Sequence, residues 1–189
     1  MRVVSGLYRG RRLFGPTWEG LRPTSDKLRE TVFNILATRV PGARVLDGYA
    51  GTGAVGLEAL SRGADSVLFV ERDRRAVALI RKNLAQCGVE GRYTIENRDL
   101  ADVLRRLESG MTFDFIFLDP PYDHPPTIAV LDEAGRRLDR GGILVLERAT
   151  RRGFDVPADL ERVRDVKSGD STLTFLARRP EAAAATEQR

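Results

Sequence analysis

Cysteine and histidine are almost absent from this 189-residue sequence, which contains one of each, Cys87 and His124. A single cysteine excludes a disulfide within the chain and indicates a reducing compartment. With only these two side chains available, the spacing of a metal site is missing, and no metal is expected. Cys87 falls late in a helical pattern and is interpreted as a core residue.

Long apolar runs are also missing. No run approaches the roughly 20 residues that a membrane-spanning helix needs. The N-terminal stretch MRVVSGLYRG lacks the apolar segment of a signal peptide. The protein is therefore expected in the cytoplasm, without a membrane partner and acting as a monomer.

Charge and apolar residues are both plentiful. The chain is 42% hydrophobic and 31% charged, which suits a single domain with its own core. The net charge of +4 favours an acidic partner such as nucleic acid only weakly, because an ordinary basic protein explains it equally well. The excess is concentrated in residues 1–29, where seven basic and two acidic side chains give +5.

Residues 2–6 and 11–15 are typical of a short β-hairpin, and residues 25–39 of an amphipathic helix with Thr24 as its N-cap. Strands and helices alternate from residue 43. The expected strands are 43–47, 66–71, 92–98, 113–119 and 142–148. The expected helices are 53–62, 74–86, 100–108 and 127–138. A closing hairpin is expected from 160–169 and 171–179, turning at Gly169-Asp170.

The alternation predicts an α/β fold with a mostly parallel sheet, helices on both faces and a C-terminal antiparallel hairpin. Residues 1–179 are expected to form one domain, made of an N-terminal extension (1–40) and a core (43–179). Residues 180–189 have low complexity and are expected to be disordered.

A glycine-rich loop, DGYAGTGAVG (47–56), follows the first strand of the alternation. It has the G-x-G-x-x-G spacing of a nucleotide-binding loop, and Glu71, at the end of the next strand, is placed to accept hydrogen bonds from ribose hydroxyls. The spacing alone fits a dinucleotide site or merely a tight turn. Asp47 favours another ligand, because pyrophosphate avoids a carboxylate whereas an ammonium or sulfonium group prefers one. The loop is therefore interpreted as an S-adenosylmethionine site.

Asp99 follows the third strand. It can accept a hydrogen bond from an adenine amino group, or it can cap the helix expected at 100–108, and the two roles are compatible.

The fourth strand ends in Asp119-Pro120-Pro121-Tyr122. In a doubly wound sheet, strands 43–47 and 113–119 are central neighbours, so this turn should face the glycine loop across one crevice. Asp119 and the Pro120 carbonyl can hold an exocyclic amine in line with a methyl group. Prolines fix the backbone, and Tyr122 offers a face for base stacking. A surface turn is the alternative. His124 is treated as a loop residue near the substrate.

Three stretches carry a family resemblance besides this motif, which resembles the [DNS]-P-P-[YFW] turn of amino-group methyltransferases. SGLYRGRRL (5–13), RPTSDKLRETVFNIL (22–36) and DGYAGTGAVGLEALSRGA (47–64) are similar to bacterial 16S rRNA guanine-N2 methyltransferases, the small-subunit rRNA methyltransferase D type. The resemblance covers residues 2–179. Gly48, where the family usually has an apolar residue, and the run 123–126 depart from it.

The resemblance implies a Rossmann-like class I methyltransferase fold with seven strands, an N-terminal hairpin and a helix. It implies methyl transfer from S-adenosylmethionine to guanine N2 of 16S rRNA in an assembling small subunit, with Asp119, Pro120 and Tyr122 at the guanine. The implied cofactor residues are Asp47, Gly51, Gly53, Glu71, Asp99 and, over the methionine end, Thr24 and Arg22. The implied RNA contacts are Arg2, Arg9, Arg11 and Arg12, unless the hairpin is simply solvated.

Three other functions share part of these features. Methylation of adenine N6 also fits the turn at Asp119, although the N-terminal stretches argue against it. A nicotinamide-dependent oxidoreductase shares the glycine loop but does not explain Asp47. A non-catalytic RNA-binding module needs only the basic segment.

Overall fold

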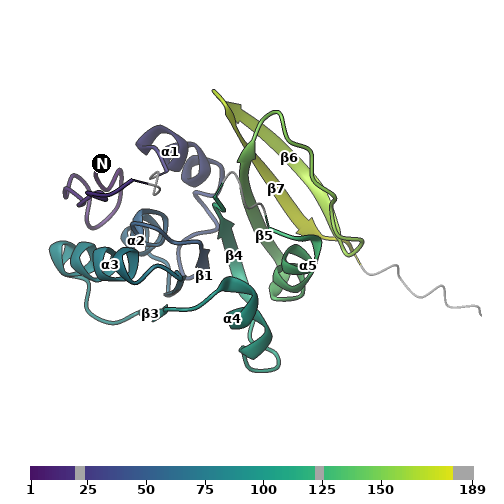
Figure 1. Cartoon of the computed structure of the whole chain (residues 1–189), viewed down its shortest axis with the longest axis horizontal. Helices are drawn as coiled ribbons and strands as arrows, with labels where there is room; N and C mark the ends of the chain where they lie inside the picture. The colour runs from purple at the N-terminus through teal and green to yellow at the C-terminus, as the bar shows by residue number, and fades with distance from the viewer. Residues whose placement is uncertain (20–23, 122–125, 181–189) are drawn as a thin grey trace, which may run out of the picture.

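The computed structural model describes residues 1–19, 24–121 and 126–180, and its centre is a seven-stranded sheet (Figure 1). The strand order is β3-β2-β1-β4-β5-β7-β6. Strands β1 to β5 pair in parallel, whereas β7 is antiparallel to both β5 and β6. The predicted α/β architecture is confirmed, including the C-terminal hairpin. The strands are β1 (Arg44–Gly48), β2 (Ser66–Val70), β3 (Tyr93–Glu96), β4 (Phe113–Leu118), β5 (Leu138–Ala149), β6 (Leu160–Ser168) and β7 (Ser171–Arg178).

Helices cover both faces of the sheet (Figure 1). Side chains alternate across each strand, so Val45 and Phe117 join one apolar layer while Leu46 and Leu118 join the other. The first layer is completed by α1 (Asp26–Ile35), α2 (Ala54–Ser61) and α3 (Arg74–Cys87), and the second by α4 (Leu100–Arg106) and α5 (Ile128–Arg136). Cys87 is buried in the first layer, as expected of a core residue. Within the described parts of the chain, no helix has the length and apolar character to cross a membrane.

Most element boundaries shift by one or two residues from the predicted ones, and two differ by more. Helix α1 is shorter than 25–39, and its N-cap is Ser25, whose Oγ accepts from the Leu28 N–H at 3.2 Å. Thr24 was the wrong choice of cap because its hydroxyl is engaged elsewhere, in the cavity described below. Strand β5 begins at Leu138 rather than at residue 142, because Leu138 already pairs with Phe113 of β4 ahead of a register shift. A Cβ on Gly142 would lie 2.9 Å from Leu138 Cδ1, so glycine permits this close packing.

The N-terminal segment pairs with itself as the short hairpin that the sequence predicts, through an antiparallel bridge between Arg2 and Arg12 and backbone bonds between residues 1–3 and 10–13. Contacts to α2 hold it as well. The buried carboxylate of Glu58 accepts the Val4 N–H at 2.8 Å and the Ser5 N–H at 2.9 Å. The segment is thus attached to the core through one side chain as much as through its own backbone pairing. Further contacts come from Ser61, which binds Ser5, Leu7 and Tyr8, and from Asn83, which binds Phe14.

Replacing Glu58 with alanine is expected to loosen this segment and to lower the free energy of unfolding by about 3 kcal/mol, because two backbone N–H groups lose their acceptor. Trypsin should then cleave faster after Arg9 and Arg12, as mass spectrometry of timed digests would show. Glu30→Ala, an exposed position on α1, is the matched control and should leave both quantities unchanged. Identical digestion of the two variants would contradict this role of Glu58.

Candidate active site

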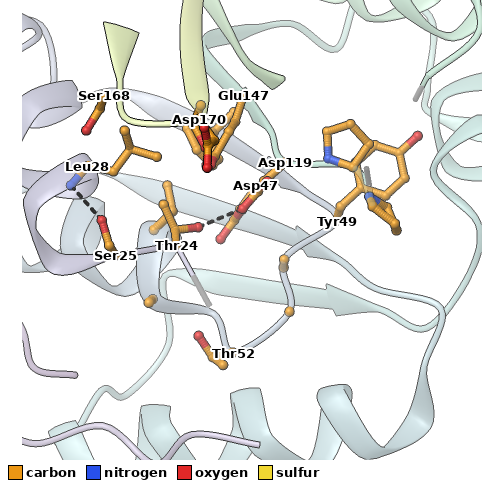
Figure 2. Close-up of a pocket in the computed structure, with 18 of the residues that line it drawn as sticks. Thr24, Ser25, Leu28, Asp47, Tyr49, Thr52, Asp119, Glu147, Ser168 and Asp170 are labelled. Atoms are coloured by element: carbon orange, nitrogen blue, oxygen red, sulfur yellow. Dashed lines mark hydrogen bonds between the residues drawn. The ribbon is translucent and has the colours of Figure 1, made fainter. Parts of the chain in front are cut away.

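A cavity of about 510 Å³ opens at the C-terminal ends of β1, β4 and β5 (Figure 2). This volume lies within the range of small-molecule sites. One wall is the glycine loop, a second is Asp119-Pro120-Pro121, and a third is the β6–β7 turn, residues 168–171. The structure therefore places the loop and the turn after β4 on one shared cavity, as the sheet order predicts. The β6–β7 turn is an unexpected third wall.

Three acids reach the cavity from neighbouring strands on the same face of the sheet. The alternation that directs Val45, Phe117 and Val145 into one layer continues to the ends of β1, β4 and β5. There the side chains are Asp47, Asp119 and Glu147, and all three line the cavity. Figure 2 shows Asp47 and Asp119 beside Thr24, with Glu147 and Asp170 close by.

Asp119 is held in position by Thr24. The Thr24 hydroxyl donates to its Oδ2 at 2.8 Å, which explains why Thr24 does not cap α1. Glu147 lines the same cavity from the neighbouring strand. Burial first, and then the charge of Glu147, raise the pKa of Asp119 well above its ordinary value, while the bond from Thr24 lowers it. The carboxyl group is thus fixed in position and retains a proton more readily than an exposed aspartate.

Asp47 is also buried, and its Oδ2 accepts the Gly56 N–H at 2.9 Å. It therefore caps α2 from the end of β1, since Gly53 at the N-cap has no side chain to do so. Burial raises the pKa of Asp47 to about 8, against the Gly56 bond, and the charge of Glu71 adds to the rise. A cation in the cavity would favour the ionised form.

The backbone of the glycine loop follows its sequence. Gly51 and Gly53 have φ of 54° and 74°, a region that glycine adopts without strain. Glu71 fixes the loop, because its Oε2 accepts the Gly51 N–H at 2.9 Å and its Oε1 accepts the Asp73 N–H at 2.8 Å. Gly48, a departure from the family pattern, leaves room for Leu118, whose Cδ2 would lie 2.6 Å from a Cβ there.

A smaller cavity of about 230 Å³ adjoins the first and shares Tyr49, Asp119 and Pro121 with it. Glu71 and Asp99 line it. Asp99 caps α4 by accepting the Ala101 N–H at 2.9 Å, so the capping role is confirmed and the adenine role stays a prediction. Asp47 thus lines the larger cavity and Asp99 the smaller one, and Asp119 borders both.

Several predicted residues lie elsewhere. Arg22, Tyr122 and His124 fall outside the described residues. The arginines of the N-terminal segment are exposed and line neither cavity. Arg11 already donates to the Cys87 carbonyl and lies over the Tyr8 ring. The exposed arginines that were predicted to contact RNA are Arg2, Arg9, Arg11 and Arg12.

The residues that line the cavities without having been predicted as site residues include Glu147, Asp170, Tyr49 and Trp18. Glu147 could have been found, because it continues the inward alternation of Ile143 and Val145 and lies at the level of Asp119. Trp18 lines the smaller cavity, with the Arg75 guanidinium 5.0 Å from its ring centroid. No pattern in the sequence predicts that Trp18 belongs to the site. Tyr49 has a φ of 62°, which is uncommon outside glycine.

The charge of the larger cavity limits its ligands. Its described lining includes four acids, Asp47, Asp119, Glu147 and Asp170, and no basic side chain. Such a lining disfavours phosphates and favours cations and hydrogen-bond donors. Among the described residues, no group of three or more histidine, cysteine or acidic side chains is arranged to hold a metal ion.

Comparison with known proteins agrees with this geometry. Residues 1–177 match the protein family described as Conserved hypothetical protein 95. The chain is 36% identical to ribosomal RNA small subunit methyltransferase D of Escherichia coli K12 over 173 residues, which are 89% of this chain and 85% of that protein. This chain belongs to the small-subunit rRNA methyltransferase D family.

Two further relatives support that assignment. The Haemophilus influenzae protein of the same name is 42% identical over 124 residues, which cover 65% of this chain and only 64% of that relative. A solved Escherichia coli structure described as a methyltransferase superposes with a TM-score of 0.82 at 32% identity, covering 94% of this chain and 97% of the other. The fold is that of the class I methyltransferases.

Proposed function

We propose that this family member transfers a methyl group from S-adenosylmethionine to N2 of a guanine in 16S rRNA, in the cytoplasm and within an assembling small subunit. The observation that carries the proposal is the acid-lined cavity that joins the glycine loop to Asp119-Pro120. The names of the relatives support rRNA of the small subunit as the substrate. Action as a monomer stays a prediction.

The chain has suitable partners for each part of the cofactor. S-adenosylmethionine, when bound, supplies a methyl group activated on a positively charged sulfur. Asp47 would pair with its ammonium group, Glu71 with its ribose hydroxyls and Asp99 with its adenine amine. Gly51 and Gly53, which have no side chains, would let the backbone of the loop approach the cofactor closely. Thr24 and Arg22 are proposed to contact the methionine end of the cofactor. The fit rests on the acid lining, because every one of these groups is a cation or a donor.

Asp119 and the Pro120 carbonyl would receive the two hydrogens of the guanine amine. The bond from Thr24 holds Asp119 in place, so the acceptor is oriented before the substrate arrives. Two acceptors on one amine direct its lone pair toward the methyl group. Tyr122 is proposed to stack on the base. The arginines of the N-terminal segment would contact RNA phosphates, which the acidic cavity excludes.

The other candidate functions are weaker. An oxidoreductase would bring a pyrophosphate to a wall that contains Asp47, which is unfavourable. Adenine N6 offers the same two amine hydrogens as guanine N2, so the turn at Asp119 does not discriminate against it.

The direct test is methyl transfer to small ribosomal subunits or rRNA from cells that lack the endogenous enzyme. Labelled S-adenosylmethionine gives the rate, and mass spectrometry of the digested RNA identifies the base. N2-methylguanosine at one position is the expected product. N6-methyladenosine, or no label in RNA while the protein binds the cofactor, would refute the proposed substrate.

Asp47→Asn is expected to weaken cofactor binding and yet to stabilise the free protein above neutral pH. The pKa of Asp47 is raised from 3.8 to about 8 on folding. The folded state therefore holds the proton more tightly, and the free energy of unfolding falls as pH rises from 3.8 toward 8. Asparagine keeps an acceptor for Gly56 and removes that loss. Loss of a charge-assisted bond should weaken binding roughly tenfold.

Thermal melts of both proteins across this pH range, and calorimetry with S-adenosylhomocysteine, check the two parts separately. A melting temperature for Asp47→Asn that stays below wild type at every pH would show that the buried acid stabilises the fold. Unchanged affinity would remove Asp47 from the ammonium site.

A further inference from the structure

Trp18 is an aromatic side chain of the smaller cavity to which the proposed cofactor contacts assign no role. It is the single tryptophan of the chain and is half-buried. It lines this cavity together with Glu71 and Asp99, the acids proposed to bind the ribose and the adenine amine. A planar apolar surface and two carboxylate acceptors thus border one cavity, a combination that suits a purine nucleoside.

A chain of contacts that starts at Glu71 holds the indole from the side of α3. Glu71 Oε1 accepts the Asp73 N–H at 2.8 Å. The Asp73 carboxylate in turn accepts a hydrogen bond from Arg75 Nη2 at 2.8 Å. The Arg75 guanidinium lies 5.0 Å from the centroid of the Trp18 ring, a cation–π contact that helps to orient the ring. The residue proposed at the ribose is therefore linked to Trp18 through three successive contacts.

The chain on the N-terminal side of Trp18 is fixed to the glycine loop by Asn83. This fully buried side chain accepts the Phe14 N–H at 2.8 Å and donates to the Phe14 carbonyl at 3.1 Å. Its Nδ2 also donates to the carbonyl of Thr52 at 2.9 Å, and Thr52 belongs to the glycine loop. The segment that carries Trp18 is thus anchored on the loop that is proposed to bind the cofactor.

Charge also distinguishes the two cavities. The described lining of the larger one has no basic side chain, whereas Arg72, Arg75 and Arg98 line the smaller one beside its acids. Two of these arginines are paired, Arg75 with Asp73 at 2.8 Å and Arg98 with Glu96 at 3.4 Å. The mixed lining suits an uncharged base, and the acidic lining of the larger cavity suits the cationic end of the same ligand.

We infer that Trp18 stacks on the adenine ring of the cofactor and that residues 14–18 close the base end of its site. The inference rests on the proposed function. Stacking removes one face of the base from water, so loss of the indole should lower the affinity for ligands that carry adenine and leave the affinity for other ligands unchanged.

The intrinsic fluorescence of the protein tests this contact directly, because Trp18 is the single tryptophan. Saturating S-adenosylhomocysteine is expected to change the emission of Trp18 and to protect the indole from quenching by acrylamide. S-ribosylhomocysteine has the same amino acid and ribose but no base, and it should change neither quantity. Titration calorimetry measures the binding of both ligands independently of fluorescence and sets the concentrations that saturate the site.

Trp18→Ala is expected to weaken the binding of S-adenosylhomocysteine about tenfold and to leave the affinity for S-ribosylhomocysteine within about twofold of wild type. Trp18→Phe keeps a smaller stacking surface and should recover most of the lost affinity. The matched control is Leu7→Ala, which removes an exposed apolar side chain from the same N-terminal segment. This control should bind both ligands as wild type does.

Unchanged emission and acrylamide quenching in wild type saturated with S-adenosylhomocysteine would overturn the inference, and so would wild-type affinity of Trp18→Ala. An equal loss of affinity for both ligands in Trp18→Ala would show that the indole supports the segment rather than the base, which also contradicts the inference. Each of these results leaves the proposed cofactor intact. Failure of wild type to bind S-adenosylhomocysteine in the calorimeter would instead refute the proposed cofactor, and the inference with it.

Discussion

Asp119→Ala is expected to lower the rate of methyl transfer by about 10²–10³-fold, while binding of S-adenosylhomocysteine changes only a few-fold. Alanine removes one of the two proposed acceptors that orient the amine and leaves only the Pro120 carbonyl, which can receive one hydrogen. The Thr24 hydroxyl also loses its partner at 2.8 Å. The effect should therefore appear in the rate of a single turnover rather than in cofactor affinity.

A milder substitution at the same position is Asp119→Asn, which keeps one acceptor oxygen and the size of the side chain. Its rate of methyl transfer should lie between those of Asp119→Ala and wild type, because asparagine can orient the amine but cannot take its proton. Circular dichroism and thermal melts would confirm that both variants fold. Full activity of Asp119→Ala would show that the amine is held by other groups, and the assignment of the turn would be wrong.

Gly56→Ala is expected to cause a large loss of stability, about 3 kcal/mol in the free energy of unfolding, with a melting temperature lower by roughly 10 °C. A Cβ there would lie 2.2 Å from Phe69 Cε1 and 2.8 Å from Val67 Cγ1. Phe69 is fully buried and has no space into which to move. Helix α2 would have to shift away from β2, and its bond to Asp47 would be disturbed as well.

Urea denaturation measures the free energy of unfolding of Gly56→Ala and of a control variant, Gly153→Ala. A Cβ on Gly153 meets nothing within 4 Å, and its backbone is compatible with alanine, so this control should change stability by less than about 0.5 kcal/mol. Equal stability of the two variants would mean that the α2–β2 contact is looser than the structure shows. Cofactor affinity should fall with stability only in Gly56→Ala.

The sequence predicts the sheet and the place of the cavity because both depend on local patterns and on one topological rule. Strand-like runs ending in Asp47 and Asp119 were enough to place the two motifs opposite each other once the order of the sheet was assumed. The choice between Thr24 and Ser25 as helix cap could not be predicted in this way. Both residues are good caps, and the outcome is set by Asp119, far away in the sequence.

The remaining differences have the same origin in long-range contacts. Glu147 becomes part of the site only through the register of β5 against β4. Residues 168–171 reach the cavity because β7 pairs with β5 and brings the turn back over the site. The N-terminal segment pairs as the predicted hairpin, but its attachment to Glu58 on helix α2 is a long-range contact that the alternation does not reveal. Roles for Arg22 and Tyr122 stay predictions.

The position of β7 has a consequence for biosynthesis. Of the described strands, the last along the chain, β7, is an interior strand that lies between β5 and β6. Until it emerges, the nascent chain presents the unpaired edge of β5, a surface prone to association with other chains. The third wall of the pocket does not yet exist at that stage. The candidate site is thus complete only after β7, the last described strand along the chain, has been synthesised.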